Sequence, residues 1–241
     1  MIHLWGGDGG RGHPGRRKLE VALLAMALMG LLSSCAAASN GVAKESGPAI
    51  LRAAARALGA SHSFEIRASS TIASSPASID FEIEGPNRGG GTFASASVSF
   101  QAEELAGVDY FRSKTLWDQV GGQSLQTALG DRWVFIAASS STAAQLTQAF
   151  GSLTSAHDLA AQLLKGIATA KRGKLGALGG RPTVEVTESP AAAVYVATSG
   201  RPFPLRWVQS TAGYVDFLNF GKSFHLKPPA KPLNLAAILG R

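Results

Sequence analysis

The sequence has few charged side chains and almost no cysteine. Charged residues make up 16% of the 241 residues, against roughly 25% in an average soluble domain. Alanine, glycine and serine take up much of the difference, while hydrophobic residues reach 45% and allow a sizeable core. The single cysteine, Cys35, excludes a disulfide within the chain. A composition this poor in reactive side chains is unfavourable for an enzyme.

Sequence motifs of catalytic and metal-binding sites are also missing. The chain has five histidines, and none has the H-E-x-x-H spacing that holds zinc; no G-x-S-x-G nucleophile motif occurs either. Ser155, His157 and Asp158 supply the residue types of a catalytic triad. Neighbours on one helical turn are better explained as the N-cap of a helix. We therefore predict that the protein is not an enzyme and has no metal site and no cofactor.

The formal net charge of +7 is spread along the chain. The densest basic cluster after the N-terminal region is Lys171-Arg172-Gly173-Lys174, which we interpret as part of a solvated loop. No nucleic-acid-binding motif accompanies it. The spread of the charge therefore favours attraction to an anionic membrane surface. We expect no nucleic-acid partner.

A segment typical of a bacterial export signal precedes the cysteine. Arg11, Arg16, Arg17 and Lys18 form a basic region, and the apolar run 21–32 follows it directly. This run is shorter than the roughly 20 apolar residues that a transmembrane helix needs. Its length is typical of the hydrophobic part of a signal peptide, so we predict that residues 1–34 are one.

The residues that end this segment, Leu32-Ser33-Ser34-Cys35, resemble the lipobox of bacterial lipoproteins. In those proteins the cysteine thiol takes a diacylglyceryl group and the cysteine becomes the first residue of the mature chain. The resemblance implies a lipid anchor at Cys35 and a location at the cell membrane, on its extracytoplasmic face. A plain secretory signal cut near residues 36–38 and an uncleaved anchor remain as alternatives.

After the cysteine the sequence predicts a tether and one domain. Residues 35–46 are small and polar, which is typical of a flexible tether, and residues 47–241 are assigned to the domain. One helix is predicted from a cap at Ser46 to Gly59. Two further helices are predicted over residues 143–150 and 155–166, in the middle of the chain.

Alternating apolar and polar residues predict about nine or ten antiparallel strands whose acidic side chains face water. The predicted strands cover residues 64–68, 79–84, 98–101, 108–110, a segment around Trp117, 131–136, 183–187, 194–197, 205–208 and 214–220. Residues 85–91 are predicted as a glycine-rich turn and residues 171–180 as a basic loop. Strands with helices in two groups predict the α+β class.

This layout resembles the LppX/LprAFG lipoproteins and, more distantly, the LolA/LolB lipoprotein carriers. The resemblance rests on Cys35, on the hairpin 194–207 with its Gly-Arg-Pro-Phe-Pro turn, on Asp216-Phe217 in the final strand, and on the proline-then-leucine tail. It implies an antiparallel β half-barrel that wraps over short helices. It also implies an apolar cavity that accepts the acyl chains of glycolipids or triacylglycerides, without any catalytic residue.

The large side chains on the apolar side of the predicted strands are the candidates for lining such a cavity. They are Phe81, Ile83, Phe100, Tyr110, Ile136, Val186, Trp207 and Phe217. Because alanine, glycine and serine dilute the core, a void between these side chains is the favoured interpretation. The alternative for each of them is ordinary packing against the helices.

Two functions follow from these two interpretations. With a void, the protein is a membrane-anchored, monomeric lipoprotein that binds or carries a lipid or glycolipid. With a filled core, it is a structural or interaction lipoprotein of the cell envelope.

Overall fold

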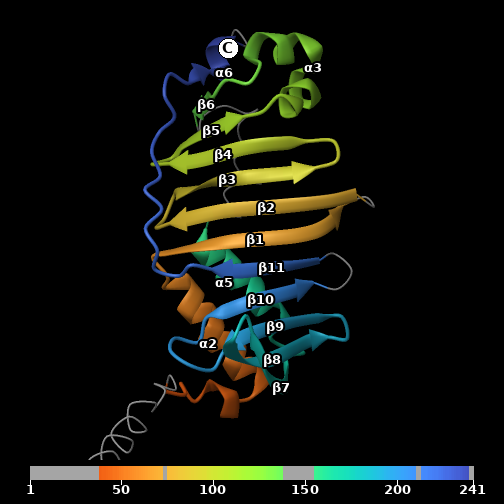
Figure 1. Cartoon of the computed structure of the whole chain (residues 1–241), viewed down its shortest axis with the longest axis vertical. Helices are drawn as coiled ribbons and strands as arrows, with labels where there is room; N and C mark the ends of the chain where they lie inside the picture. The colour runs from red at the N-terminus through yellow and green to blue at the C-terminus, as the bar shows by residue number, and fades with distance from the viewer. Residues whose placement is uncertain (1–37, 73–74, 138–154, 210–212, 239–241) are drawn as a thin grey trace, which may run out of the picture. The chain divides into compact units, whose positions relative to one another are not determined.

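The structure is a computed structural model that describes residues 38–72, 75–137, 155–209 and 213–238 (Figure 1). Ser39–Arg241 forms one compact unit. Its main element is one sheet of 12 strands in the order β12-β6-β5-β4-β3-β2-β1-β11-β10-β9-β8-β7. All neighbouring strands are antiparallel except β12 and β6, which are parallel. The two end strands do not pair with each other, so the sheet is open.

The strands have the following bounds. They are β1 Ser63–Ile72, β2 Ser75–Glu84, β3 Arg88–Ser95, β4 Ser99–Leu105, β5 Val108–Arg112, β6 Val134–Ala137, β7 Lys171–Leu178, β8 Arg181–Ser189, β9 Ala192–Ala197, β10 Pro204–Gln209, β11 Gly213–Leu218 and β12 Leu233–Asn234.

The described helices are short and lie mainly on one face of the sheet, which we call the inner face. They are η1 Val42–Lys44, α2 Gly47–Gly59, α3 Thr115–Leu129, α5 Ala156–Leu163, η2 Leu164–Gly166 and α6 Leu235–Ile238. Helix α2 packs against β7 to β10 and against α5, which lies behind β10 and β11 in Figure 1. None of these helices is both long and apolar enough to span a membrane. The result is the predicted α+β class, an open antiparallel sheet consistent with a half-barrel.

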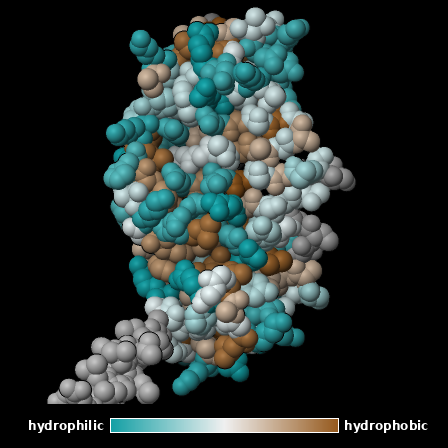
Figure 2. Space-filling model, viewed as in Figure 1, coloured by the Kyte–Doolittle hydropathy of each residue, from teal (hydrophilic) through white to brown (hydrophobic). Residues whose placement is uncertain are grey.

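Period-two alternation divides the side chains of the strands between two faces. Phe64 and Ile66 of β1 and Phe81 and Ile83 of β2 are at most 2% exposed and belong to the core of the inner face. The other face, the outer face, is the one seen in Figure 2, where hydrophilic and hydrophobic side chains are mixed. Burial of one face of each strand is what alternation predicts for a half-buried sheet.

Charged residues form a cross-strand row on the outer face. Arg67 lies opposite Asp80 on one side and Asp216 on the other, and Arg206 lies opposite Asp216. Arg206 makes a bidentate contact, with its Nε 2.5 Å from Asp216 Oδ1 and its Nη2 2.8 Å from Oδ2. Opposite charges on directly facing residues stabilise strand pairs. The row therefore supports the register of β2, β1, β11 and β10.

The helix boundaries predicted from capping residues are confirmed. Helix α2 starts after Ser46 and ends at Gly59. Helix α5 starts after Ser155, whose hydroxyl accepts a hydrogen bond from the backbone N–H of Asp158 at 3.1 Å. The interpretation of these neighbours as a helix cap agrees with this geometry. The helix predicted over residues 143–150 lies outside the described residues.

Three local predictions are wrong. Trp117 lies in helix α3 and not in a strand, and its side chain is completely buried. Residues 171–178 form strand β7 and not a loop, since β8 supplies their pairing partner. The turn predicted over residues 85–91 ends before Arg88, because Gly89, Gly90 and Gly91 are part of β3. For both strands, pairing with the adjacent strand of a hairpin decides the conformation.

The domain also begins earlier than predicted. Asn40 Nδ2 donates hydrogen bonds to Ala197 O at 2.9 Å and to Gly200 O at 3.1 Å. Val42 is 5% exposed and belongs to the core. Residues from Ser39 onward are therefore packed against the domain, and the part of the chain free to act as a tether is shorter than residues 35–46.

We expect Gly91→Ala to destabilise the protein by about 1–3 kcal/mol, the usual cost of overpacking. A Cβ atom at this position would lie 2.0 Å from Asp80 O and 2.3 Å from Phe81 Cδ1. The matched control is Gly176→Ala in β7, where the nearest atom to the new Cβ is Thr183 Oγ1 at 3.9 Å. The control should be neutral or slightly stabilising. Urea denaturation measures both; equal midpoints would contradict the close approach at Gly91.

Candidate ligand site

The structure places most of the predicted cavity residues together on the inner face, in one core cluster. The most deeply buried ones are at most 2% exposed: Phe81, Ile83, Ile136, Val186 and Phe217. Phe100 and Trp207 are partly buried and pack against this cluster. Side chains with so little exposure are already surrounded by protein atoms. For these residues the structure therefore shows core packing.

Tyr110 is the exception, because it lies on the outer face. It pairs with Glu103 on β4 and with Phe135 on β6, while its neighbour Phe111 is in the core. The prediction assigned Asp109 to water and Tyr110 to the interior. In the structure Asp109 is only 3% exposed. Alternation was correct, but the side of the strand that faces inward was assigned wrongly.

An apolar hollow of about 210 Å³ lies at the margin of the core. It is bounded by the inner-face side chains of β1, β2, β10 and β11 and by helix α5. Its lining residues are Ile66, Ala68, Ser70, Ile79, Leu159, Gln162, Trp207, Gln209, Gly213, Tyr214 and Val215. Trp207 is the one predicted cavity residue among them. The alternation of β1 and β2 could have indicated Ile66, Ala68 and Ile79, but the contribution of α5 required the fold.

The hollow is small for a ligand site. Pockets that hold drug-sized molecules have volumes of roughly 300–1,000 Å³, so about 210 Å³ accommodates a stretch of hydrocarbon and not a whole lipid. Its walls are mostly apolar, and its polar side chains, Gln162 and Gln209 among them, are neutral. A hydrocarbon chain is the chemical group that such walls favour.

A carboxyl group lies next to one wall of the hollow. Trp207 Nε1 donates a hydrogen bond to Glu188 Oε2 at 3.2 Å. The other oxygen, Glu188 Oε1, is buried without a hydrogen-bond partner among the described residues. Burial raises the pKa of Glu188, and the hydrogen bond from Trp207 opposes this rise. Glu188 thus offers an unused acceptor beside Trp207.

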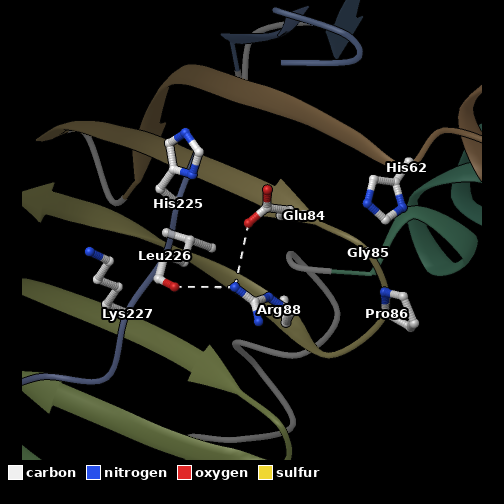
Figure 3. A pocket seen from close by; sticks show the side chains of 8 residues that line it. All are labelled: His62, Glu84, Gly85, Pro86, Arg88, His225, Leu226 and Lys227. Atoms are coloured by element: carbon white, nitrogen blue, oxygen red, sulfur yellow. Dashed lines mark hydrogen bonds and ion pairs between the residues drawn. The ribbon is translucent and has the colours of Figure 1, made fainter. Parts of the chain in front are cut away.

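A second, larger pocket of about 510 Å³ lies between the β2–β3 turn and the segment that follows β11 (Figure 3). It is open, with His62, Glu84, Arg88, His225 and Lys227 in its wall. The side chain of Arg88 reaches both Glu84 Oε2, at 3.5 Å, and Leu226 O, at 3.1 Å.

These contacts attach the chain after β11 to the sheet. Ser223 Oγ donates to Glu84 Oε1 at 2.9 Å, and this hydrogen bond lowers the pKa of Glu84. Further along, Leu233 N donates to Trp133 O at 2.8 Å, just before β12 pairs with β6. The pocket is therefore explained by the packing of this segment along the strand ends. Within the described ranges, no three histidine, cysteine or acidic side chains are placed to hold a metal ion.

We expect Glu188→Gln to be more stable than the wild-type protein above neutral pH. Because the folded-state pKa is raised, the stability that Glu188 contributes is complete below its unfolded pKa and is lost as the pH rises through the folded pKa. Glutamine keeps an acceptor for Trp207 without a charge. The urea midpoints should coincide at about pH 4 and differ at about pH 8. Glu188→Ala, which removes the acceptor, should be less stable than Glu188→Gln at both pH values. If the urea midpoints of Glu188→Gln and the wild-type protein differ by the same amount at both pH values, the raised pKa of Glu188 is contradicted.

Comparison with known proteins identifies a structural neighbour. No family model matches the sequence, and no curated protein matches it. The crystal structure of LprF from Mycobacterium bovis is similar, with a TM-score of 0.51 and 13% sequence identity, over 76% of this chain and 97% of that chain. At this identity the likeness concerns the fold alone. LprF is of the LppX/LprAFG type, so the likeness supports the fold inferred from the sequence resemblance.

Proposed function

We propose that this protein is a lipoprotein, anchored by acylated Cys35 on the extracytoplasmic face of the cell membrane, that binds an acyl chain of a lipid or glycolipid. The observation that carries the proposal is the apolar hollow between α5 and the inner face of an open, LprF-like sheet. The protein acts by binding and does no chemistry.

Small residues keep the hollow open. Ala68 and Ser70 of β1 and Gly213 of β11 all belong to its wall. A larger side chain at position 68 would extend into the hollow, because Ala68 is on the inner face between Ile79 and Val215. Each CH₂ group of a ligand that leaves water for this surface contributes about 0.8 kcal/mol. The hollow therefore favours a stretch of acyl chain over water.

The second candidate is a structural or interaction lipoprotein with a filled core. The burial of Phe81, Ile83, Ile136, Val186 and Phe217 favours it, since side chains with so little exposure are surrounded by protein atoms. The two candidates share the anchor and the fold. They differ in whether the hollow at the margin of the core takes up a ligand.

Ala68→Phe tests the first candidate. The new ring should occupy the hollow, reduce the amount of lipid that copurifies with the protein, and leave the urea midpoint near the wild-type value. Native mass spectrometry measures the lipid. The matched control is Ala102→Phe on the inner face of β4, where alanine is completely buried and borders no described pocket.

The control should lose about 1–3 kcal/mol of stability through overpacking, with unchanged lipid per folded molecule. If the wild-type protein carries no lipid and both variants are equally destabilised, the filled-core candidate is correct.

Cys35→Ser tests the anchor. We expect the variant to move from the detergent phase to the aqueous phase or to remain unprocessed, because the chain has no other thiol for acylation. Two or three acyl chains make a durable attachment, and loss of all of them removes it. Detergent partitioning of membrane fractions is the measurement. A cleaved Cys35→Ser protein that stays in the detergent phase would contradict acylation at this residue.

A further inference from the structure

We propose that the domain rests on the membrane with the end formed by β7, η1 and the β9–β10 turn, and that basic residues there contact anionic lipid headgroups. This inference rests on the proposed anchor at Cys35. It adds the orientation of the domain and the class of lipid that its surface meets.

The first step is the place where the chain enters the domain. Ser39 forms a bridge with Ser199, and Asn40 N donates to Thr198 O at 2.9 Å. The side chain of Asn40 adds two more hydrogen bonds to the same turn. A fully extended chain from Cys35 to Ser39 spans at most about 14 Å. An acylated Cys35 therefore keeps the β9–β10 turn close to the bilayer surface.

The second step is that strand β7 lies at the same end of the unit (Figure 1). Arg172 Nη1 donates a hydrogen bond to Ala43 O, in η1, at 3.3 Å. Gly47, the first residue of α2, packs so closely on the chain before β7 that a Cβ atom would lie 2.6 Å from Ala170 O. These contacts fix the edge of the sheet next to the entry point of the chain.

The third step is the chemistry of this edge. Strand β7 carries Lys171, Arg172 and Lys174, all of them exposed. The nearby residues Lys44 and Arg181 are exposed as well. Within the described ranges none of these side chains forms an ion pair. Each basic residue near an anionic leaflet strengthens attachment by about fivefold.

The exposure of Leu175 favours a membrane surface over plain solvent as the environment of this edge. Leu175 follows Lys174 in β7 and is 68% exposed, the highest value among the large hydrophobic side chains described as exposed. Basic residues on an edge strand also prevent pairing with other strands. That role explains the charges of β7, which pairs with β8 and with no other described strand, but it does not explain an exposed leucine. An exposed apolar side chain on a strand that also carries exposed basic ones fits a segment that lies in a membrane interface.

The experiment uses the acylated full chain in vesicles of phosphatidylcholine, with or without phosphatidylglycerol. Because acylation converts the thiol of Cys35 to a thioether, Leu175→Cys supplies the only free thiol for an environment-sensitive dye. The matched control is Val120→Cys on α3, 37% exposed and at the opposite end of the unit. We expect a blue-shifted, quencher-protected signal at position 175 in the anionic vesicles and a water-exposed signal at position 120.

Charge variants complete the test. Adding Lys171→Glu and Lys174→Glu, or adding salt, should return the label at position 175 to water while the protein stays with the vesicles. The corresponding pair Lys227→Glu and Lys231→Glu, in the segment after β11, should have no effect. If the protein remains bound after a salt wash but the label at position 175 is as exposed in the anionic vesicles as the label at position 120, the inference is wrong. This outcome leaves the anchor uncontradicted. Protein that is washed off the vesicles contradicts the anchor and the inference with it.

Discussion

The pairing of β1 with β11 holds the sheet together, because it joins two parts in which each strand pairs with the next one along the chain. On one side β1 to β6 follow one another as an antiparallel meander, and on the other side β7 to β11 do the same. The pairing places Ile66 opposite Phe217 and Ala68 opposite Val215, so it builds the core and one wall of the hollow at once. A slip of one residue would exchange the two faces. It would bring Arg67 and Asp216 inside, which their outer charge row disfavours.

Local regularity explains which parts of this fold the sequence could predict. The segment Ile79–Glu84 alternates without interruption, and the caps at Ser46 and Ser155 are specified by a few adjacent residues. Trp117, Tyr110 and β7 were predicted wrongly because their environment comes from elsewhere. β7 is a strand because β8 pairs with it, and Gly91 is a strand residue because β2 approaches its backbone. Such cross-strand contacts leave no periodic signal in these segments of the sequence.

The candidate site shows the same limit in a different form. A core rich in alanine and glycine predicted a void, but several of these small residues serve close packing. Ala54 in α2 and Ala102 in β4 are completely buried in the core cluster, and Gly91 leaves room for Phe81. Only Ala68, Ser70 and Gly213 among the small residues border the hollow. Composition therefore indicates that space is available, whereas the position of that space depends on where the α5 helix crosses the strands.

The position of the hollow within the sheet has a consequence for how a ligand would enter. Neighbouring strands lie about 4.8 Å apart, so the hollow at β10, β11 and β1 is roughly 15–20 Å from edge strand β7. With β7 at the membrane surface, an acyl chain in the hollow has left the bilayer entirely. Its withdrawal from the bilayer opposes binding by about the same 0.8 kcal/mol per CH₂ that the hollow returns. A hollow of about 210 Å³ covers only part of a long chain. The proposed binding of a lipid therefore requires polar contacts as well, for which Gln162 and Gln209 lie in the wall of the hollow.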